Sequence, residues 1–310
     1  MPNHRVMYNV ARTLRDSYDN SILTDTAKRL YFGNNRGVNQ GIIKGIMKYG
    51  QAERKAQLIK QVQSKYPGIS AKQASKFLST IDTNVGVCNY ADFANAIAEY
   101  FVKHPEISFE ERFGFPLFIQ IDGIEILNAP QLLLDIYMEI NGDIFVKSGG
   151  SLYEFFTGSA FKSSDSNRGY LNLNKAVGEN YKYRLNLLNK YLNSRGFNIG
   201  TNEWLIQNTI FNSYGVKNLN NTLARDYVVS MISRELAKGR HLSIGTVKGA
   251  EMINQDGSKI VVRGAHVMTI LGVMEDGKIL VNSWGSVYEI EIGQLLKNNI
   301  VFTIDEIHIE

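Results

Sequence analysis

Residues 264–268 read Gly-Ala-His-Val-Met, and residues 281–285 read Val-Asn-Ser-Trp-Gly. Both runs set polar side chains in apolar stretches typical of strands, and an Asp-Gly turn signal between them predicts a β-hairpin. The chain has one cysteine, Cys88, far upstream of both. A lone thiol, a histidine on an apolar strand (His266) and an asparagine on the next strand (Asn282) are the three parts of a Cys-His-Asn nucleophilic site.

In such a site the cysteine attacks a carbonyl carbon, and the histidine takes the thiol proton and holds it as an imidazolium. The asparagine accepts a hydrogen bond from the other imidazole N–H. Its neutral amide suffices because thiolate and imidazolium already balance each other. We expect Trp284 to lie over the Asn–His hydrogen bond and exclude water. Cys88 begins a predicted helix, where the helix dipole and a nearby imidazolium favour the thiolate.

Each of these residues also has an ordinary structural interpretation. A single cysteine outside a disulfide is usually a small buried hydrophobe, and a histidine on an apolar strand is usually a core residue with a satisfied hydrogen bond. Among the other histidines, His241 is the main competitor for a catalytic role. The combination of a histidine strand, a hairpin and Asn-Ser-Trp-Gly is more specific than any of its parts.

Composition limits the classes of function. At 310 residues the chain is long enough for one large domain or two lobes. Its 34 basic and 30 acidic residues are spread along the sequence and leave a net charge of only +4, so we expect no nucleic-acid partner. One cysteine excludes an intramolecular disulfide and a Cys-rich zinc site. No apolar run of about 18 residues predicts a membrane span.

The start of the chain bears on localisation. Residues 1–20 carry charges throughout and lack the apolar segment of a Sec signal peptide. We therefore expect a cytoplasmic protein, or one delivered into a host or target cell.

The order of predicted elements indicates the α+β class, with a helical front half and a β-rich back half. The predicted regions are an N-terminal helical region over 1–80, a helical lobe with the nucleophile and an Asn/Tyr-rich insertion over 81–222, and a β-rich lobe with the histidine and asparagine over 223–310. Ser70-Ala71-Lys72-Gln73 has the capping-box pattern of a helix start, and Asp122-Gly123 predicts a hairpin turn.

The run Val281-Asn282-Ser283-Trp284-Gly285 resembles the asparagine signature of papain-like cysteine proteases, and further segments narrow the resemblance to the calpain family. These segments are Gly86-Val87-Cys88 with the Ala-rich helix through Ala98 to His104-Pro105-Glu106, Leu133 to Gly142, Gly149-Gly150, Phe156-Thr157-Gly158, Glu235 to Gly245, and Gly264-Ala265-His266. They follow the family's order over about residues 81–290, as a divergent calpain-like core. The resemblance implies a two-lobed papain-like fold and hydrolysis of peptide bonds in a protein substrate through a thioester. It also implies a Cys88–His266–Asn282 triad without a cofactor.

Two departures from the family pattern bear on activity. Asn89 stands where the family has a tryptophan after the cysteine, and Asp82 stands where the family has a glutamine that donates into the oxyanion hole. A carboxylate there would repel the developing oxyanion, and one missing donor costs about 3–4 kcal/mol of transition-state stabilisation. Asn84, together with the backbone N–H of Cys88, is the candidate replacement donor.

Several alternatives stay open at this point. The same triad would serve an acyl-transfer enzyme such as a deamidase or transglutaminase-like enzyme, and Asp82 and Asn89 favour a catalytically decayed binding module. Residues 1–80 are a pro-segment that fills the chain's own cleft, with processing near Ser79–Asn84, or else an integral helical cap or a subdomain that binds a partner protein. We predict no metal site, because no carboxylate-rich loop of the EF-hand kind is present, and calcium dependence stays open.

Overall fold

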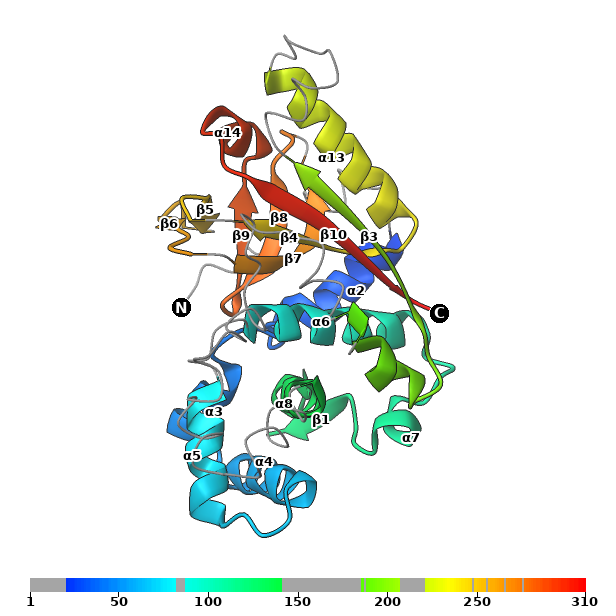
Figure 1. Cartoon of the computed structure of the whole chain (residues 1–310), viewed down its shortest axis with the longest axis vertical. Coiled ribbons are helices and arrows are strands. Elements are labelled where there is room, and N and C mark those ends of the chain that lie inside the picture. Colours follow the sequence, from blue (N-terminus) through cyan, green and yellow to red (C-terminus); the bar gives the residue numbers. More distant parts are fainter. Residues whose placement is uncertain are drawn as a thin grey trace. The chain divides into compact units, whose positions relative to one another are not determined.

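The computed structural model describes residues 21–81, 87–140, 185–186, 188–206, 221–246, 248–254, 256–264, 266–274 and 276–310. They form helices and antiparallel sheets, in agreement with the predicted α+β class (Figure 1). The chain divides into two compact units, each assembled from separate stretches of sequence. The first comprises Met1–Gly37, Asn95–Ser108 and Ile199–Glu310, and the second comprises Val38–Ala94 and Phe109–Asn198. The boundaries placed after residues 80 and 222 follow sequence order and stay a prediction.

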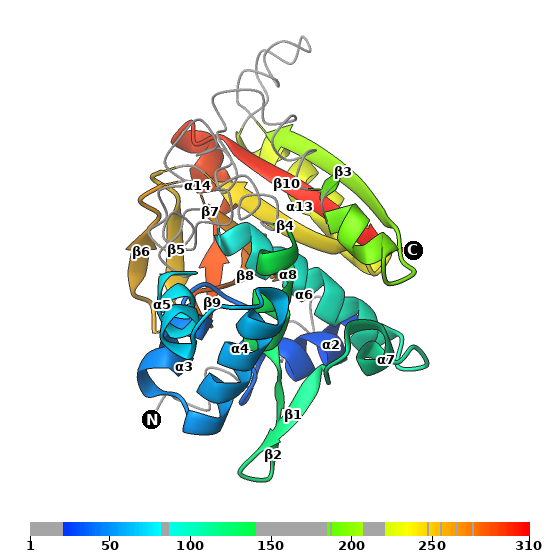
Figure 2. The ribbon, with the colours of Figure 1, turned by 60° about the horizontal axis from the view of Figure 1, so that its bottom comes forward.

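The second unit is mainly helical. Its elements are α3 (Ile42–Tyr49), α4 (Ala52–Lys65), α5 (Ala71–Ile81), α7 (Phe109–Phe113), α8 (Ala129–Ile140), β1 (Phe118–Ile121) and β2 (Ile124–Leu127). The capping box at the start of α5 is confirmed: Ser70 Oγ accepts from the Gln73 N–H at 3.2 Å, and Gln73 Oε1 accepts from the Ser70 N–H at 2.9 Å. The predicted turn at Asp122 and Gly123, both with positive φ, joins β1 and β2 into the separate ribbon seen in Figure 2.

Helix α6 (Val87–Lys103) contributes to both units, since its residues up to Ala94 belong to the second and those from Asn95 to the first. Its sequence is rich in alanine and aromatic residues, and the helix is buried along most of its length. This agrees with the Ala-rich helix that the sequence predicts from Cys88.

The first unit is built around an eight-stranded antiparallel sheet. Its strands are β3 (Ile199–Ile206), β4 (His241–Thr246), β5 (Glu251–Asn254), β6 (Lys259–Val261), β7 (His266–Val273), β8 (Ile279–Ser283), β9 (Ser286–Ile290) and β10 (Phe302–Ile309). Across the sheet they lie in the order β3-β10-β4-β7-β8-β9-β5-β6, so β10 separates β3 from β4. The other helices among the described residues of this unit are α2 (Ser21–Tyr31), α13 (Asn221–Ala237) and α14 (Ile292–Lys297).

Helix α13 covers apolar side chains of the central strands. Its core residues Val228, Ile232 and Leu236 cluster with Ile244 of β4, Ile270 of β7 and Val281 of β8. The hairpin that the sequence predicts between the strands of His266 and Asn282 is confirmed as β7 and β8. Strand β3, in contrast, comes from the region 81–222, for which the sequence predicts a helical lobe with an Asn/Tyr-rich insertion. No described helix has both the length and the apolar character needed to cross a bilayer.

Candidate active site

His266 is the first residue of β7 and lies opposite Thr246 of β4 in the antiparallel register. Its side chain is buried, and only 5% of the residue is exposed. The Nε2 atom lies 2.6 Å from the hydroxyl oxygen of Ser283, the last residue of β8. The indole of Trp284 stacks on the imidazole, with ring centroids 4.4 Å apart and planes 15° apart. The hydrogen bond to Ser283 and the stacking of Trp284 therefore hold the imidazole in place.

Trp284 takes its position through a strained turn. Trp284 and Gly285 form the two-residue turn that joins Ser283 of β8 to Ser286 of β9. Their φ angles are 45° and 75°, the type I′ pattern that matches the twist of a hairpin. A left-handed conformation costs about 1–2 kcal/mol for a tryptophan, and stacking on His266 offsets part of that cost. An indole that excludes water from the imidazole must lie flat against the ring, as Trp284 does here. That Trp284 excludes water stays a prediction.

Desolvation sets the charge of the histidine. Burial lowers the pKa of His266 from 6.5 to about 4, so the neutral imidazole prevails at pH 7 when no anion lies beside it. An imidazolium at this position therefore needs a neighbouring negative charge, and a thiolate is one that the proposed chemistry would supply.

In a Cys88→Ala background, which holds no thiolate, replacing Trp284 by asparagine is expected to raise the pKa of His266 from about 4 toward 6.5, because water would reach the ring face that the indole covers. The hairpin should tolerate the change, since Asn-Gly is the preferred pair for a type I′ turn. The folded pKa lies below the unfolded value, so the chain that keeps Trp284 loses stability as pH falls from about 6.5 to about 4, and the Trp284→Asn variant should lose less. Imidazole titration by NMR and denaturant unfolding at neutral and acidic pH measure both effects. An unchanged pKa would show that other groups desolvate the ring.

Asn282 is buried in β8 opposite Thr269 of β7. A Cβ atom on Gly37 would lie 2.6 Å from Nδ2 of Asn282, so glycine, with φ of 63°, lets the backbone pass close to this amide. Within the described part of the chain, the hydrogen bond of the His266 ring goes to Ser283 rather than to Asn282. The role of Asn282 as third member of the triad stays a prediction, and Ser283 is a site residue that sequence reasoning missed.

Cys88 is the second residue of α6 and is partly exposed. In the first turn of a helix, unpaired backbone N–H groups and the helix dipole favour a thiolate. Cys88 belongs to the second unit, whereas His266 and Asn282 belong to the first. Asp82 and Asn84 lie outside the described residues, so their oxyanion-hole roles stay predictions.

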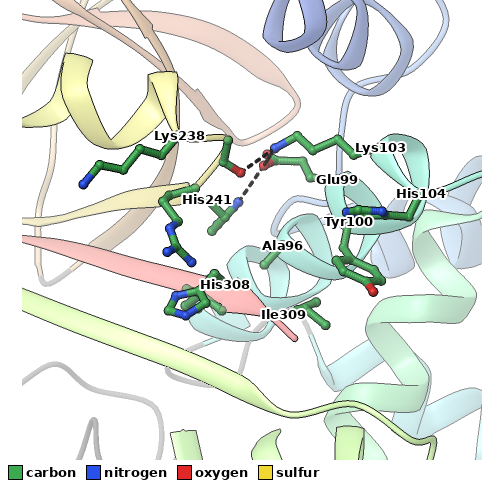
Figure 3. Close-up of a pocket in the computed structure, with 12 residues that line it drawn as sticks. Ala96, Glu99, Tyr100, Lys103, His104, Lys238, His241, His308 and Ile309 are labelled. Atoms are coloured by element: carbon green, nitrogen blue, oxygen red, sulfur yellow. Dashed lines mark hydrogen bonds and ion pairs between the residues drawn. The ribbon is translucent and has the colours of Figure 1, made fainter.

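A pocket of about 180 Å³ lies in the first unit, lined by the last turns of α6, the start of β4 and the end of β10 (Figure 3). Figure 3 shows Lys103 and His241 directed at the carboxylate of Glu99. Glu99 Oε2 lies 3.1 Å from His241 Nδ1 and 4.0 Å from Lys103 Nζ, and the Tyr31 hydroxyl donates to Oε1. Burial raises the pKa of Glu99, but His241, Lys103 and Tyr31 together outweigh burial and hold this pKa below its usual value.

A second buried carboxylate, Glu306 of β10, has similar surroundings. Its Oε1 lies 3.4 Å from both Arg240 Nε and His308 Nδ1, and Asn202 Nδ2 donates to its Oε2 at 3.1 Å. Each buried carboxylate thus has one permanent cation and one histidine beside it, which compensates its charge. His241 is the histidine that the sequence offers as the main alternative to His266 for a catalytic role. In this network it lies beside the carboxylate of Glu99.

Metal binding has no geometric support in the described ranges, where no three His, Cys, Asp or Glu side chains are grouped closely enough to hold an ion. A comparison with models of known protein families gives no match for the chain, and a comparison with curated proteins gives none.

Proposed function

We propose that the chain is a cysteine peptidase with a papain-like two-lobed fold, in which Cys88 is the nucleophile and His266 the base. The observation that carries the proposal is the state of His266. Its ring is buried on an apolar strand, bonded through Nε2 and stacked under Trp284, which leaves Nδ1 to accept a proton. The partial exposure of Cys88 in the first turn of α6 supports it.

The proposed reaction begins with transfer of the thiol proton of Cys88 to Nδ1 of His266. The thiolate adds to a peptide carbonyl, and the oxyanion accepts hydrogen bonds from the Cys88 backbone N–H and, in this proposal, from Asn84. The C–N bond breaks as the imidazolium protonates the leaving amine, and a thioester remains. Water, deprotonated by His266, then hydrolyses the thioester and restores the thiol.

An acyl-transfer enzyme would form a thioester by the same steps, but from a side-chain amide with loss of ammonia. In a deamidase water would then hydrolyse the thioester, and in a transglutaminase an amine would take the acyl group. Incubating the protein with an unfolded protein such as denatured casein, followed by mass spectrometry, separates the outcomes. Peptidase activity gives cleavage products, a deamidase gives a one-dalton gain, and a transglutaminase gives crosslinks. Each product should disappear in Cys88→Ala. Parallel reactions with added calcium and with a chelator reveal any calcium dependence.

The N-terminal helices are tested in the same incubation. A shortened product of the intact chain, absent in Cys88→Ala, would identify residues 1–80 as a pro-segment. Two contacts favour an integral cap for the part that ends at Gly37. The Tyr31 hydroxyl donates to the buried Glu99, and Gly37 lies against the amide of Asn282 within the same compact unit. We therefore expect the chain to keep residues 21–37 while it is active.

A further inference from the structure

The hydroxyl of Ser283 lies at hydrogen-bond distance from Nε2 of His266, at 2.6 Å, and both residues are buried. We propose that Ser283 is the positioning residue for the His266 imidazole in the thiol chemistry suggested above, a role that the sequence assigns to Asn282. The inference rests on the proposed function for its catalytic meaning. The hydrogen bond itself lies wholly within the first unit.

Strand geometry separates Ser283 from Asn282. Successive residues of a strand point to opposite faces of the sheet, and residues paired across strands share a face. Asn282 is paired with Thr269, whose Oγ1 accepts a hydrogen bond from Asn95 Nδ2 of α6 at 3.0 Å. His266 is not paired with Asn282 in this register, and the contact of its ring is with Ser283, the last residue of β8.

The surroundings of this hydrogen bond suit a catalytic imidazole. Trp284 covers the ring from one side, so little water competes for Nε2. A proton held on Nε2 and donated to Ser283 leaves the lone pair of Nδ1 available as the base. When Nδ1 takes up the thiol proton, the Nε2–H of the imidazolium donates to the Ser283 oxygen, and a hydrogen bond from a charged donor is stronger than one from a neutral donor.

A hydroxyl differs from an asparagine oxygen in one respect. The asparagine oxygen only accepts, whereas the Ser283 hydroxyl accepts from Nε2–H or donates to a bare Nε2. Ser283 therefore supports the imidazolium strongly but allows both tautomers of the neutral ring. Loss of the Ser283 hydroxyl should therefore change the pH at which the thiolate–imidazolium pair forms, and not only the maximal rate at which Cys88 reacts.

The first test uses Cys88→Ala, so that no thiol chemistry enters. In ¹H–¹⁵N NMR spectra of the imidazole, we expect a slowly exchanging His266 Nε2–H that Ser283→Ala removes. We expect Ser283→Thr to keep this signal, because threonine also carries a hydroxyl, and Asn282→Ala to leave it in place. A signal that survives Ser283→Ala and disappears in Asn282→Ala would overturn the proposal.

The second test measures the alkylation of Cys88 by iodoacetamide against pH. Ser283→Ala should move the midpoint of fast alkylation upward by about one pH unit, equal to about a tenfold lower rate on the acidic side, and Ser283→Thr should restore it. Fast alkylation that Ser283→Ala does not change would overturn the positioning role and leave the proposed function standing. Slow alkylation that persists in the unsubstituted chain after denatured casein has been added, with no product from casein, would instead overturn the proposed function, and the NMR result would still decide whether Ser283 holds the ring.

Discussion

Replacing His266 by alanine is expected to move the midpoint of the pH profile for alkylation of Cys88 by iodoacetamide from roughly pH 3–4 to about pH 8.5. A cysteine with an ordinary pKa near 8.5 is less than about 1% thiolate at pH 6, whereas an ion-paired thiol with a pKa of roughly 3–4 is almost entirely thiolate. A thiolate of low pKa is also a weaker nucleophile, so the midpoint of the profile, rather than the absolute rate, is the readout. The alanine variant lacks the imidazolium and should show the ordinary midpoint.

The matched control is His104→Ala, because His104 is an exposed histidine that contacts the exposed Glu106 just after α6. This control should leave the alkylation rate unchanged. The rate is followed by mass spectrometry between about pH 4 and pH 9. A slow reaction that rises only near pH 8.5 in the unsubstituted chain and in His266→Ala alike would contradict the ion pair. It would favour a decayed site or a site blocked by the N-terminal helices.

Replacing Glu99 by leucine is expected to destabilise the first unit by about 3–5 kcal/mol, because it removes one partner of a buried charge network. His241, Lys103 and the Tyr31 hydroxyl would each lose a hydrogen-bond acceptor or a counter-charge. Denaturant unfolding measures the loss. We expect Glu99→Leu combined with His241→Leu to recover part of it, since the second change removes an imidazole that would otherwise lack its partner.

The exposed Glu106 supplies the control, and Glu106→Leu should change stability by no more than about 0.5 kcal/mol. The dependence of the free energy of unfolding on pH gives a second measurement. The folded pKa of Glu99 is held below its usual value of 4.5, so its contribution is present at neutral pH and is lost as pH falls through the folded pKa. Glu99→Leu should therefore flatten the decline in stability below about pH 4.5. A loss under about 1 kcal/mol would show that the network contributes little.

Local signals in the sequence predicted the features that depend on neighbouring residues. The capping box at Ser70, the turn at Asp122 and the strands on both sides of the 276–277 turn depend on a few adjacent side chains, and the structure contains all of them. The helix from Val87 also follows from its own apolar pattern.

Features that depend on distant partners were not predicted. The network around Glu99 joins side chains of α2, α6 and β4, and no sequence spacing links them. Strand β3 lies in a polar, Asn-rich stretch whose partner, β10, comes much later in the chain. The choice between Asn282 and Ser283 depends on the register of β7 and β8, because these neighbours face opposite sides of the sheet.

The position of β10 between β3 and β4 has a consequence for biosynthesis. Ile206 of β3 pairs with Phe302 of β10, so a ribosome adds about 100 residues after β3 before this partner exists. During that interval both β3 and the facing side of β4 expose unpaired backbone, which is a template for wrong pairing between nascent chains. Closure of the sheet is thus a late event that depends on contacts distant in sequence, which makes folding slow. While the chain is being made, a holdase chaperone that binds extended segments would protect it.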